Sequence, residues 1–342
     1  MRQASLSRVI LRVIAPPNAH DPNDSRESPK SQPPGRRAPR IAFVGSGGAA
    51  RGIAHLGVLK ACEELGIQFD VFVGASAGAV VGATYGQGMP LDLLLDAYRL
   101  PWRRKYDASL RLHATQFFGA PRLRDLLSPG YLTSGLFSID KLEAILRKSL
   151  PSNEFKKVAK TILVTAVDVD GRGRVVFGRG HDEDTSISQA VAASCCVPGL
   201  FRPYAINGRY HLDGELVRTL SADLAVEAGV DIVIVSNIYR QETVREGQRS
   251  IAHRGPLSVL TQSLNIVLSE KERRGLDLYA RTYPKVTFIN VSPDIGSFGY
   301  LNRFAARALV MRGYREALRE LAAAKDRGVF DLRPDLKLVS GG

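Results

Sequence analysis

Cysteine is scarce in this chain of 342 residues, which contains only Cys62, Cys195 and Cys196. Three cysteines are too few for a disulfide framework, and none of them lies in a Cys-x-x-Cys or Cys/His metal spacing. This scarcity excludes a disulfide-stabilised secreted scaffold and a cysteine-based zinc module. A reducing compartment is therefore expected, and we predict a cytoplasmic protein.

Long apolar runs are also missing, although hydrophobic residues make up 44% of the chain. No stretch approaches the roughly 18 uninterrupted apolar residues that a membrane-spanning helix needs. The short apolar run at residues 9–14 is interrupted by Arg12, and no clear cleavage site follows it. We therefore predict neither a transmembrane helix nor a targeting signal.

Acidic residues are outnumbered, because 47 lysines and arginines against 34 aspartates and glutamates give a net charge of +13. This surplus favours anionic partners such as phospholipid headgroups or nucleic acid. Residues 99–111 combine basic side chains with Trp102, the only tryptophan. That mixture suits docking to an anionic membrane surface, although a solvated helix face with Trp102 packed inward fits equally well. Aromatic residues are only 7%, and without a recognition motif no nucleic acid is expected as a partner.

The composition changes sharply near residue 40. Residues 1–39 hold seven of the 18 prolines among polar residues, and such a segment cannot bury enough apolar surface to offset its ordering entropy. We predict a disordered N-terminal arm over residues 1–39 and a catalytic core over residues 40–228. Residues 229–342 are expected to form a C-terminal α/β part that completes the same domain.

Apolar patterning alternates between strand and helix along the rest of the chain. Strands are predicted by the apolar runs at 41–44, 69–73, 162–167, 231–236 and 286–291. Helices are predicted at 53–65, 79–85, 139–150, 256–273 and 303–324. The dipeptides Asp170-Gly171 and Asn207-Gly208 are typical hairpin turns, so we expect an α/β fold whose sheet is mixed.

The sequence Gly74-Ala75-Ser76-Ala77-Gly78 lies directly between a predicted strand and a predicted helix. In that context Gly-x-Ser-x-Gly is typical of a nucleophile elbow, a sharp turn that exposes the serine hydroxyl at the start of a helix. The positive end of the helix dipole there favours the negative charge that develops during ester cleavage. A plain Gly/Ser turn is the alternative interpretation.

The glycine-rich loop at residues 45–52 has two interpretations. Its small side chains allow backbone N–H groups to converge on an oxyanion, with Arg51 adding positive charge nearby. Gly45-x-Gly47-x-x-Ala50 also satisfies the dinucleotide fingerprint, so a nucleotide-binding or regulatory α/β protein is the competing hypothesis. That fingerprint expects an acidic residue about 20 residues further on, where this chain has the Ser76 turn instead.

Asp213-Gly214 follows the predicted hairpin strand at residues 209–212. A carboxylate at a strand end there suits acceptance of the Ser76 proton, although Asp-Gly on its own is often only a turn. A Ser-His-Asp triad would need His253, which is the only histidine after Asp213 and lies in a polar stretch.

These pieces occur in an order that resembles the bacterial-type patatin-like phospholipase family. The family pattern is a glycine-rich oxyanion loop ending in Arg/Lys-Gly, then Gly-x-Ser-x-Gly, then a distant Asp-Gly/Ala. This chain offers matching segments at residues 47–59, 73–78, 192–201 and 208–214. The resemblance covers residues 40–228, and three ordered motifs are far more specific than any one of them.

The resemblance implies a three-layer α/β/α fold and a Ser-Asp dyad, in which Ser76 is the nucleophile that forms an acyl-enzyme and Asp213 is the base. It implies an oxyanion hole of Gly47, Gly48 and Ala49. The implied supporting residues are Arg51, Gly52, Gly74, Gly78 and Gly214.

No cofactor and no metal are implied, and the implied substrate is a membrane lipid with an acyl ester. The resemblance thus suggests a serine esterase in lipid degradation, of phospholipase A or lysophospholipase type, associated peripherally with the membrane. Two departures stand out. Ala49 replaces the third glycine, which introduces strain if that backbone needs a positive φ. Glu215 replaces a small residue and is expected to raise the pKa of Asp213 by charge repulsion.

Overall fold

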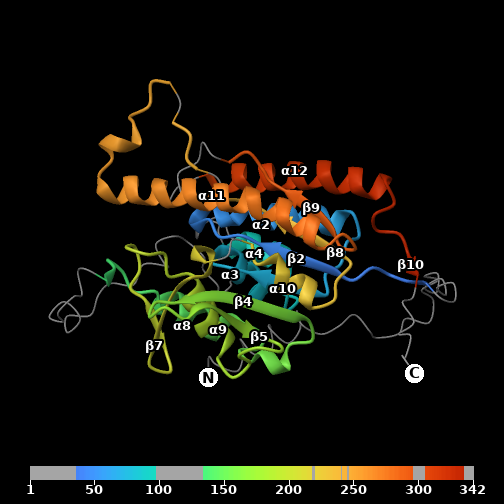
Figure 1. Cartoon of the computed structure of the whole chain (residues 1–342), viewed down its shortest axis with the longest axis horizontal. Helices are drawn as coiled ribbons and strands as arrows, with labels where there is room; N and C mark the ends of the chain where they lie inside the picture. The colour runs from blue at the N-terminus through green and yellow to red at the C-terminus, as the bar shows by residue number, and fades with distance from the viewer. Residues whose placement is uncertain are drawn as a thin grey trace, which may run out of the picture. The chain divides into compact units, whose positions relative to one another are not determined.

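The computed structural model describes residues 36–97, 134–217, 220–239, 241–244, 246–295 and 305–334. Most of the predicted N-terminal arm and all of the basic segment at residues 99–111 lie outside the described residues. Residues Ala38–Leu332 form one compact unit, which contains every predicted site residue (Figure 1). A separate pair of antiparallel strands, β1 (Arg36–Arg37) and β10 (Arg333–Pro334), belongs to the second unit.

The main unit is built on a mixed sheet of eight strands. Its parallel strands follow the order β4 (Thr161–Asp168), β3 (Val71–Gly74), β2 (Ile41–Gly45), β8 (Ile232–Ser236) and β9 (Thr287–Val291). Three antiparallel strands complete the sheet. Strand β5 (Gly173–Gly178) pairs with the edge of β4 away from β3, and β7 (Arg209–Asp213) pairs with the end of β4 on the same edge as β3. Strand β6 (Tyr204–Ile206) pairs with β7. All five predicted strand segments and both hairpins are present, and the predicted mixed sheet is confirmed.

The central strands are buried on both faces, because alternate side chains enter two different cores. On β2, Ile41 and Phe43 belong to one hydrophobic cluster, and Ala42 and Val44 belong to the other. The first cluster packs against α2 (Ala54–Glu64), α3 (Ala77–Tyr85), α4 (Leu91–Ala97), α8 (Asp140–Ser149), α9 (Ile187–Ser194) and α12 (Ala306–Asp326). The second packs against α10 (Ala222–Glu227) and α11 (Pro256–Thr282). The fold is the predicted three-layer α/β/α arrangement (Figure 1).

Helices α2 and α12 approach each other closely because glycines face the contact. A Cβ atom added at Gly57 would lie 2.0 Å from the carbonyl oxygen of Val310, and one added at Gly313 would lie 2.2 Å from that of Ala54. No side chain fits in so little space. The C-terminal helix is therefore packed against the helix that follows the glycine-rich loop.

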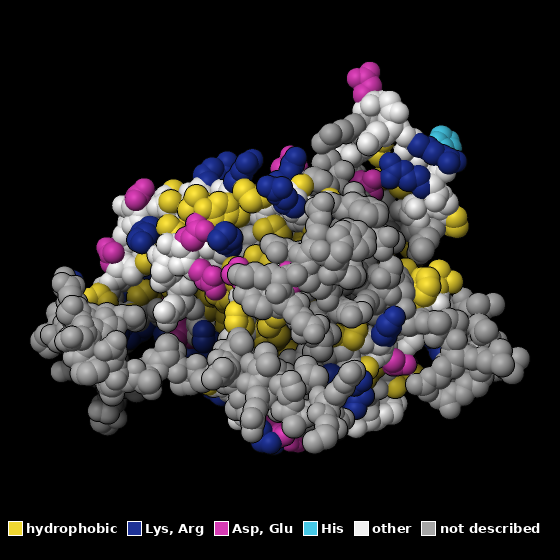
Figure 2. All heavy atoms as spheres, turned by 180° about the vertical axis from the view of Figure 1, so that it is seen from behind, with side chains coloured by type: hydrophobic (Ala, Val, Ile, Leu, Met, Phe, Trp, Pro, Cys, Tyr) yellow, Lys and Arg dark blue, Asp and Glu magenta, His cyan; other side chains and the backbone are white. Residues whose placement is uncertain are grey.

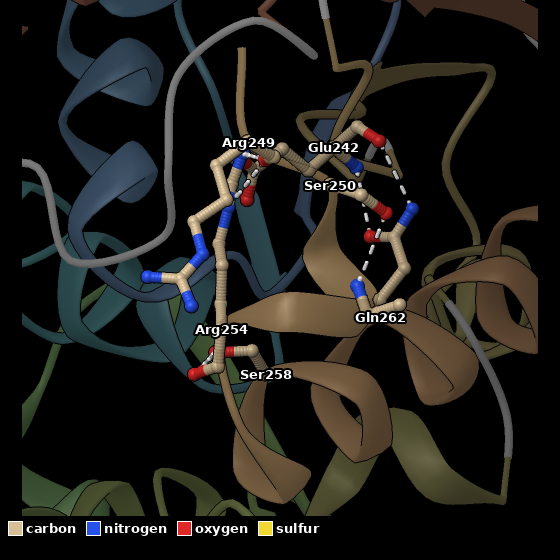
Figure 3. Close-up of polar contacts among 7 residues, drawn as sticks. Glu242, Arg249, Ser250, Arg254, Ser258 and Gln262 are labelled. Atoms are coloured by element: carbon tan, nitrogen blue, oxygen red, sulfur yellow. Dashed lines mark hydrogen bonds and ion pairs between the residues drawn. The ribbon is translucent and has the colours of Figure 1, made fainter.

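The loop between β8 and α11 is tied to the first turns of α11 by polar contacts (Figure 3). Arg254 forms an ion pair of 2.6 Å with Glu242, and Gln262 exchanges two hydrogen bonds with the backbone of Glu242 at 2.9 and 3.0 Å. His253 lies in this loop, in the short helix η5 (Ile251–His253), and its side chain is exposed.

Candidate active site

The sheet topology brings the ends of β3 and β7 together. Strand β5 runs along one edge of β4, so β3 and β7 share the opposite edge. On that edge Gly74 is opposite Val164 and Asp213 is opposite Ala166, only two residues further along β4. Because the two strands run toward each other, the turn after β3 and the end of β7 meet.

Ser76 occupies the turn between β3 and α3 in a strained conformation, with φ 51° and ψ −119°. Such a backbone costs about 1–3 kcal/mol and persists only where the surroundings enforce it. Here the Ser76 N–H donates a hydrogen bond of 2.8 Å to the Ser194 hydroxyl on α9. A Cβ atom at Gly78 would lie 2.1 Å from the carbonyl oxygen of Gly45, so the turn also needs glycine at that position. The local geometry is that of a nucleophile elbow.

Asp213 is buried at the end of β7, beside the Ser76 hydroxyl. Burial raises the pKa of Asp213 to about 6, while hydrogen bonds from the Glu215 N–H, at 3.1 Å, and from the Ser76 hydroxyl oppose the rise. The Asp213 N–H is itself fixed by the Cys196 carbonyl at 2.9 Å. The carboxylate is therefore held in place and is more basic than an exposed aspartate, as a general base near neutral pH should be.

The remaining predicted supporting residues occupy tightly packed positions around this pair. A Cβ atom added at Gly74 would lie 2.4 Å from the Gly78 carbonyl carbon, and one added at Gly52 would lie 2.4 Å from the Ala77 Cβ. A Cβ atom added at Gly214 would lie 2.2 Å from the Thr165 carbonyl oxygen. Arg51 is completely buried in the short helix η1 (Ala49–Ile53). The three glycines therefore allow close packing of η1 on the elbow, of the two ends of the elbow on each other, and of the turn after Asp213 on β4.

The glycine-rich loop enters η1 with two residues of positive φ, Gly48 at 149° and Ala49 at 50°. Ala49 therefore has the strained backbone that the missing third glycine predicts. In the described part of the chain, the Gly48 and Ala49 amides donate no hydrogen bond, whereas the Gly47 N–H donates one of 2.8 Å to Glu215 Oε1. Gly47 also lies against the elbow, since a Cβ atom there would be 3.2 Å from the Ser76 Cβ.

The His55 ring holds the glycine-rich loop through hydrogen bonds. Its position on a predicted helix did not reveal this contact. Its Nε2–H donates to the Ser46 carbonyl at 2.8 Å, and its Nδ1 accepts from the Ser236 hydroxyl at 2.6 Å. Burial lowers the pKa of His55 to about 4, so the ring is neutral and has this single tautomer. Sequence reasoning also missed Ser194, because a serine inside a helix gives no signal of a contact 118 residues away.

Glu215 has a different effect from the one predicted. The pKa of Asp213 is raised, as expected, but the cause is burial, and Glu215 acts on Asp213 through its backbone N–H. The charge repulsion instead adds to burial in raising the pKa of Glu215 well above its usual range. Folding therefore favours the protonated form of the Glu215 carboxyl group.

Two histidines, His211 and His253, bear on the possibility of a Ser-His-Asp triad. His211 is buried on the same face of β7 as Asp213, but its Nδ1 pairs with the Tyr204 carbonyl at 3.3 Å. His253 is exposed, whereas Ser76 and Asp213 are buried. Neither observation favours a Ser-His-Asp triad.

The described residues contain neither a metal-binding cluster nor a membrane-spanning helix. No three His, Cys, Asp or Glu side chains of that part of the chain lie together as a metal site would require. None of the helices described there is long and apolar enough to cross a membrane.

The chain is similar to one known family and to several known proteins. Residues 43–226, more than half of the chain, match the sequence model of the patatin-like phospholipase family. One uncharacterized NTE family protein of Mycobacterium tuberculosis is 27% identical over 300 residues, which are 84% of this chain and 47% of that protein. A second one is 25% identical over 208 residues, or 61% and 51%. This chain thus spans about half the length of these relatives.

The chain is also similar to more distant proteins. The mouse patatin-like phospholipase domain-containing protein 6 is 24% identical over 59% of this chain and 14% of its own length. Among solved structures, VipD from Legionella pneumophila aligns with a TM-score of 0.41 and 16% identity, over 84% of this chain and 67% of VipD. The type III effector ExoU aligns with a TM-score of 0.42 and 17% identity, over 84% and 55%.

Proposed function

The chain belongs to the patatin-like phospholipase family, and on this premise we propose that it is a hydrolase of lipid acyl esters. Within that class we propose a serine esterase of phospholipase A or lysophospholipase type. Its catalytic residues are Ser76 as nucleophile and Asp213 as base. The backbone amides of the glycine-rich loop stabilise the oxyanion, and the Gly48 and Ala49 amides are the two donors available to it.

The reaction proceeds in two steps. The Ser76 hydroxyl oxygen attacks the ester carbonyl carbon while Asp213 accepts the hydroxyl proton. The tetrahedral oxyanion is held by loop amides and collapses by breaking the ester C–O bond, and the alcohol leaves with the proton from Asp213. Water then attacks the acyl-enzyme with Asp213 again as base, which releases the fatty acid and regenerates Ser76.

One observation carries the proposal: two residues 137 positions apart in sequence meet in a buried site. The Ser76 hydroxyl lies close enough to the Asp213 carboxylate to lower its pKa by hydrogen bonding. The burial of Asp213 keeps its carboxylate basic enough to accept a proton from that hydroxyl. The competing nucleotide-binding function is less well supported, because a carboxyl group already occupies the Gly47 amide that a phosphate would need.

A serine-reactive fluorophosphonate probe tests the proposal. The wild-type protein should be labelled on the peptide that contains Ser76 and should hydrolyse lysophospholipid or phospholipid. Ser76→Ala should lose both properties, and Asp213→Asn should lose at least about 100-fold in kcat, since the base is removed. Ser263→Ala, at an exposed serine on α11, is the matched control and should behave as wild type. Full activity of Ser76→Ala or Asp213→Asn would refute the assigned roles.

We propose that the enzyme acts as a peripheral protein on the cytoplasmic side of an anionic membrane. The chain carries a net charge of +13, and α11 exposes Val259, Leu260, Ile266 and Val267. In Figure 2, Lys and Arg side chains lie beside exposed hydrophobic side chains along the upper edge of the molecule. Sedimentation with vesicles tests this point, because binding should require anionic lipid and should weaken with salt. Equal binding to purely zwitterionic vesicles would contradict it.

We also retain the proposed domain organisation, in which residues 229–342 complete the domain formed by residues 40–228. Strand β8 pairs with β2 along five residues, and β9 extends the same sheet, which supports this division. A chain that ends at residue 228 should therefore fail to fold, since β2 would expose an unpaired edge. Circular dichroism of that truncation would check the expectation.

A further inference from the structure

Glu215 links the oxyanion loop to the turn that carries Asp213. Its backbone N–H donates to Asp213 Oδ1 at 3.1 Å, and its side-chain Oε1 accepts from the Gly47 N–H at 2.8 Å. A Cβ atom at Gly47 would lie 3.0 Å from the Glu215 Cγ and 3.2 Å from the Ser76 Cβ. One residue therefore touches the loop and the base-bearing turn, and it lies beside the elbow.

This carboxyl group is buried among charges of both signs. Glu215 is only 1% exposed, and its Oε2 atom has no hydrogen-bond partner within the described part of the chain. The charged groups that act on it are Asp213 on β7 and Lys271 and Glu272 on α11. The ring of Tyr239, which follows β8, lies at the same point, 3.2 Å from a Cβ atom added at Gly47.

We propose that Glu215 is a positioning residue of the reaction, whose carboxyl group fixes the Gly47 amide so that the Gly48 and Ala49 amides face the acyl carbonyl. The inference rests on the proposed function and deepens it, because it divides the loop amides into one structural donor and two oxyanion donors. A small residue at position 215 would leave the Gly47 N–H without this acceptor. The loop would then be free to move relative to Ser76 and Asp213.

The protonation state of Glu215 gives the proposal a second consequence. Burial and the neighbouring Asp213 raise the pKa of Glu215 well above its usual range, so the carboxyl group keeps its proton to a higher pH than an exposed glutamate does. A negative charge at this point would repel the oxyanion that forms beside Gly47. Activity should therefore rise as Asp213 loses its proton near pH 6 and should fall again when Glu215 ionises.

Two substitutions of Glu215 distinguish its role as a hydrogen-bond acceptor for Gly47 from the effect of its negative charge. Glu215→Gln keeps an oxygen that accepts from Gly47 but has no charge at any pH, whereas Glu215→Ala removes the acceptor. We expect kcat to fall roughly 10- to 100-fold in Glu215→Ala, with KM changed less than about twofold, since a small misplacement of transition-state donors has that effect. Glu215→Gln should retain kcat within about threefold and should lose the decline in activity that accompanies ionisation of Glu215. Glu227→Gln, at an exposed glutamate, is the matched control.

A readout that does not need hydrolysis accompanies the kinetics. Amide hydrogen exchange of the peptide that contains Gly47 should become faster in Glu215→Ala and should stay as in wild type in Glu215→Gln. If Glu215→Ala is as active as wild type, or more active, the proposal is overturned. The proposal is also overturned if kcat falls as much in Glu215→Gln as in Glu215→Ala. A wild-type protein that resists fluorophosphonate would refute the proposed function, while the exchange result would still decide whether Glu215 anchors the loop.

Discussion

Replacing Asp213 by asparagine should make the folded protein more stable above about pH 6. Burial raises the pKa of Asp213 from its ordinary 3.8 to about 6, so folding opposes its ionisation. When the pKa of a carboxyl group is higher in the folded protein than in the unfolded chain, its contribution to stability is fully present at a pH below the pKa of the unfolded chain. This contribution is lost as the pH rises through the pKa of the folded protein. The difference between 3.8 and about 6 corresponds to about 3 kcal/mol of unfolding free energy.

Asparagine has nearly the same shape and can still accept the hydrogen bond from the Glu215 N–H, but it does not ionise. We therefore expect the unfolding free energy of Asp213→Asn, relative to wild type, to increase by about 3 kcal/mol between about pH 4 and about pH 8. Urea unfolding of both proteins across this range measures the difference directly. Titration of the groups that do not interact with Asp213 cancels in the subtraction.

Asp184→Asn is the control with the opposite sign, because Lys156 lowers the pKa of this exposed aspartate by a hydrogen bond of 2.6 Å. It should give no gain in stability at alkaline pH. If the Asp213→Asn difference stays constant within about 0.5 kcal/mol from about pH 4 to about pH 8, Asp213 ionises as easily in the folded protein as in the unfolded chain. The reasoning that makes it a buried, basic carboxylate would then fail.

Three further substitutions test other parts of the structure. Ala49→Gly should raise the unfolding free energy by up to about 1 kcal/mol, because glycine adopts the positive φ of 50° without strain; a loss of stability in urea would contradict this. His55→Leu should lower the unfolding free energy by about 1–3 kcal/mol and should reduce kcat, because the Ser46 carbonyl loses a buried hydrogen-bond donor. An unchanged unfolding free energy and an unchanged kcat would exclude the supporting role. Gly57→Ala should lower the melting temperature by disrupting the contact with Val310, at a cost of about 1–3 kcal/mol, and a thermal scan would reveal it.

Local sequence patterns were sufficient to predict most of the sheet and the chemical groups at the site. The Asp170-Gly171 and Asn207-Gly208 turns set both hairpins, because each needs only neighbouring residues to define its geometry. The elbow at Ser76 was readable for the same reason, since its strand, turn and helix are contiguous. The end of α11 was predicted too early, at residue 273, because the buried contacts that continue the helix to Thr282, such as that of Tyr279, are made with distant strands.

By itself the sequence determined which residue types were present and in which order, and this identified Ser76, Asp213 and the glycine-rich loop as candidates. Only the tertiary structure decided how they meet, because β3 and β7 become neighbours by pairing with the same edge of β4. It also decided that Glu215 engages Gly47, a contact across 168 residues. Such contacts depend on which strands pair and on how tightly helices pack, and these are properties of the whole core that no local pattern contains.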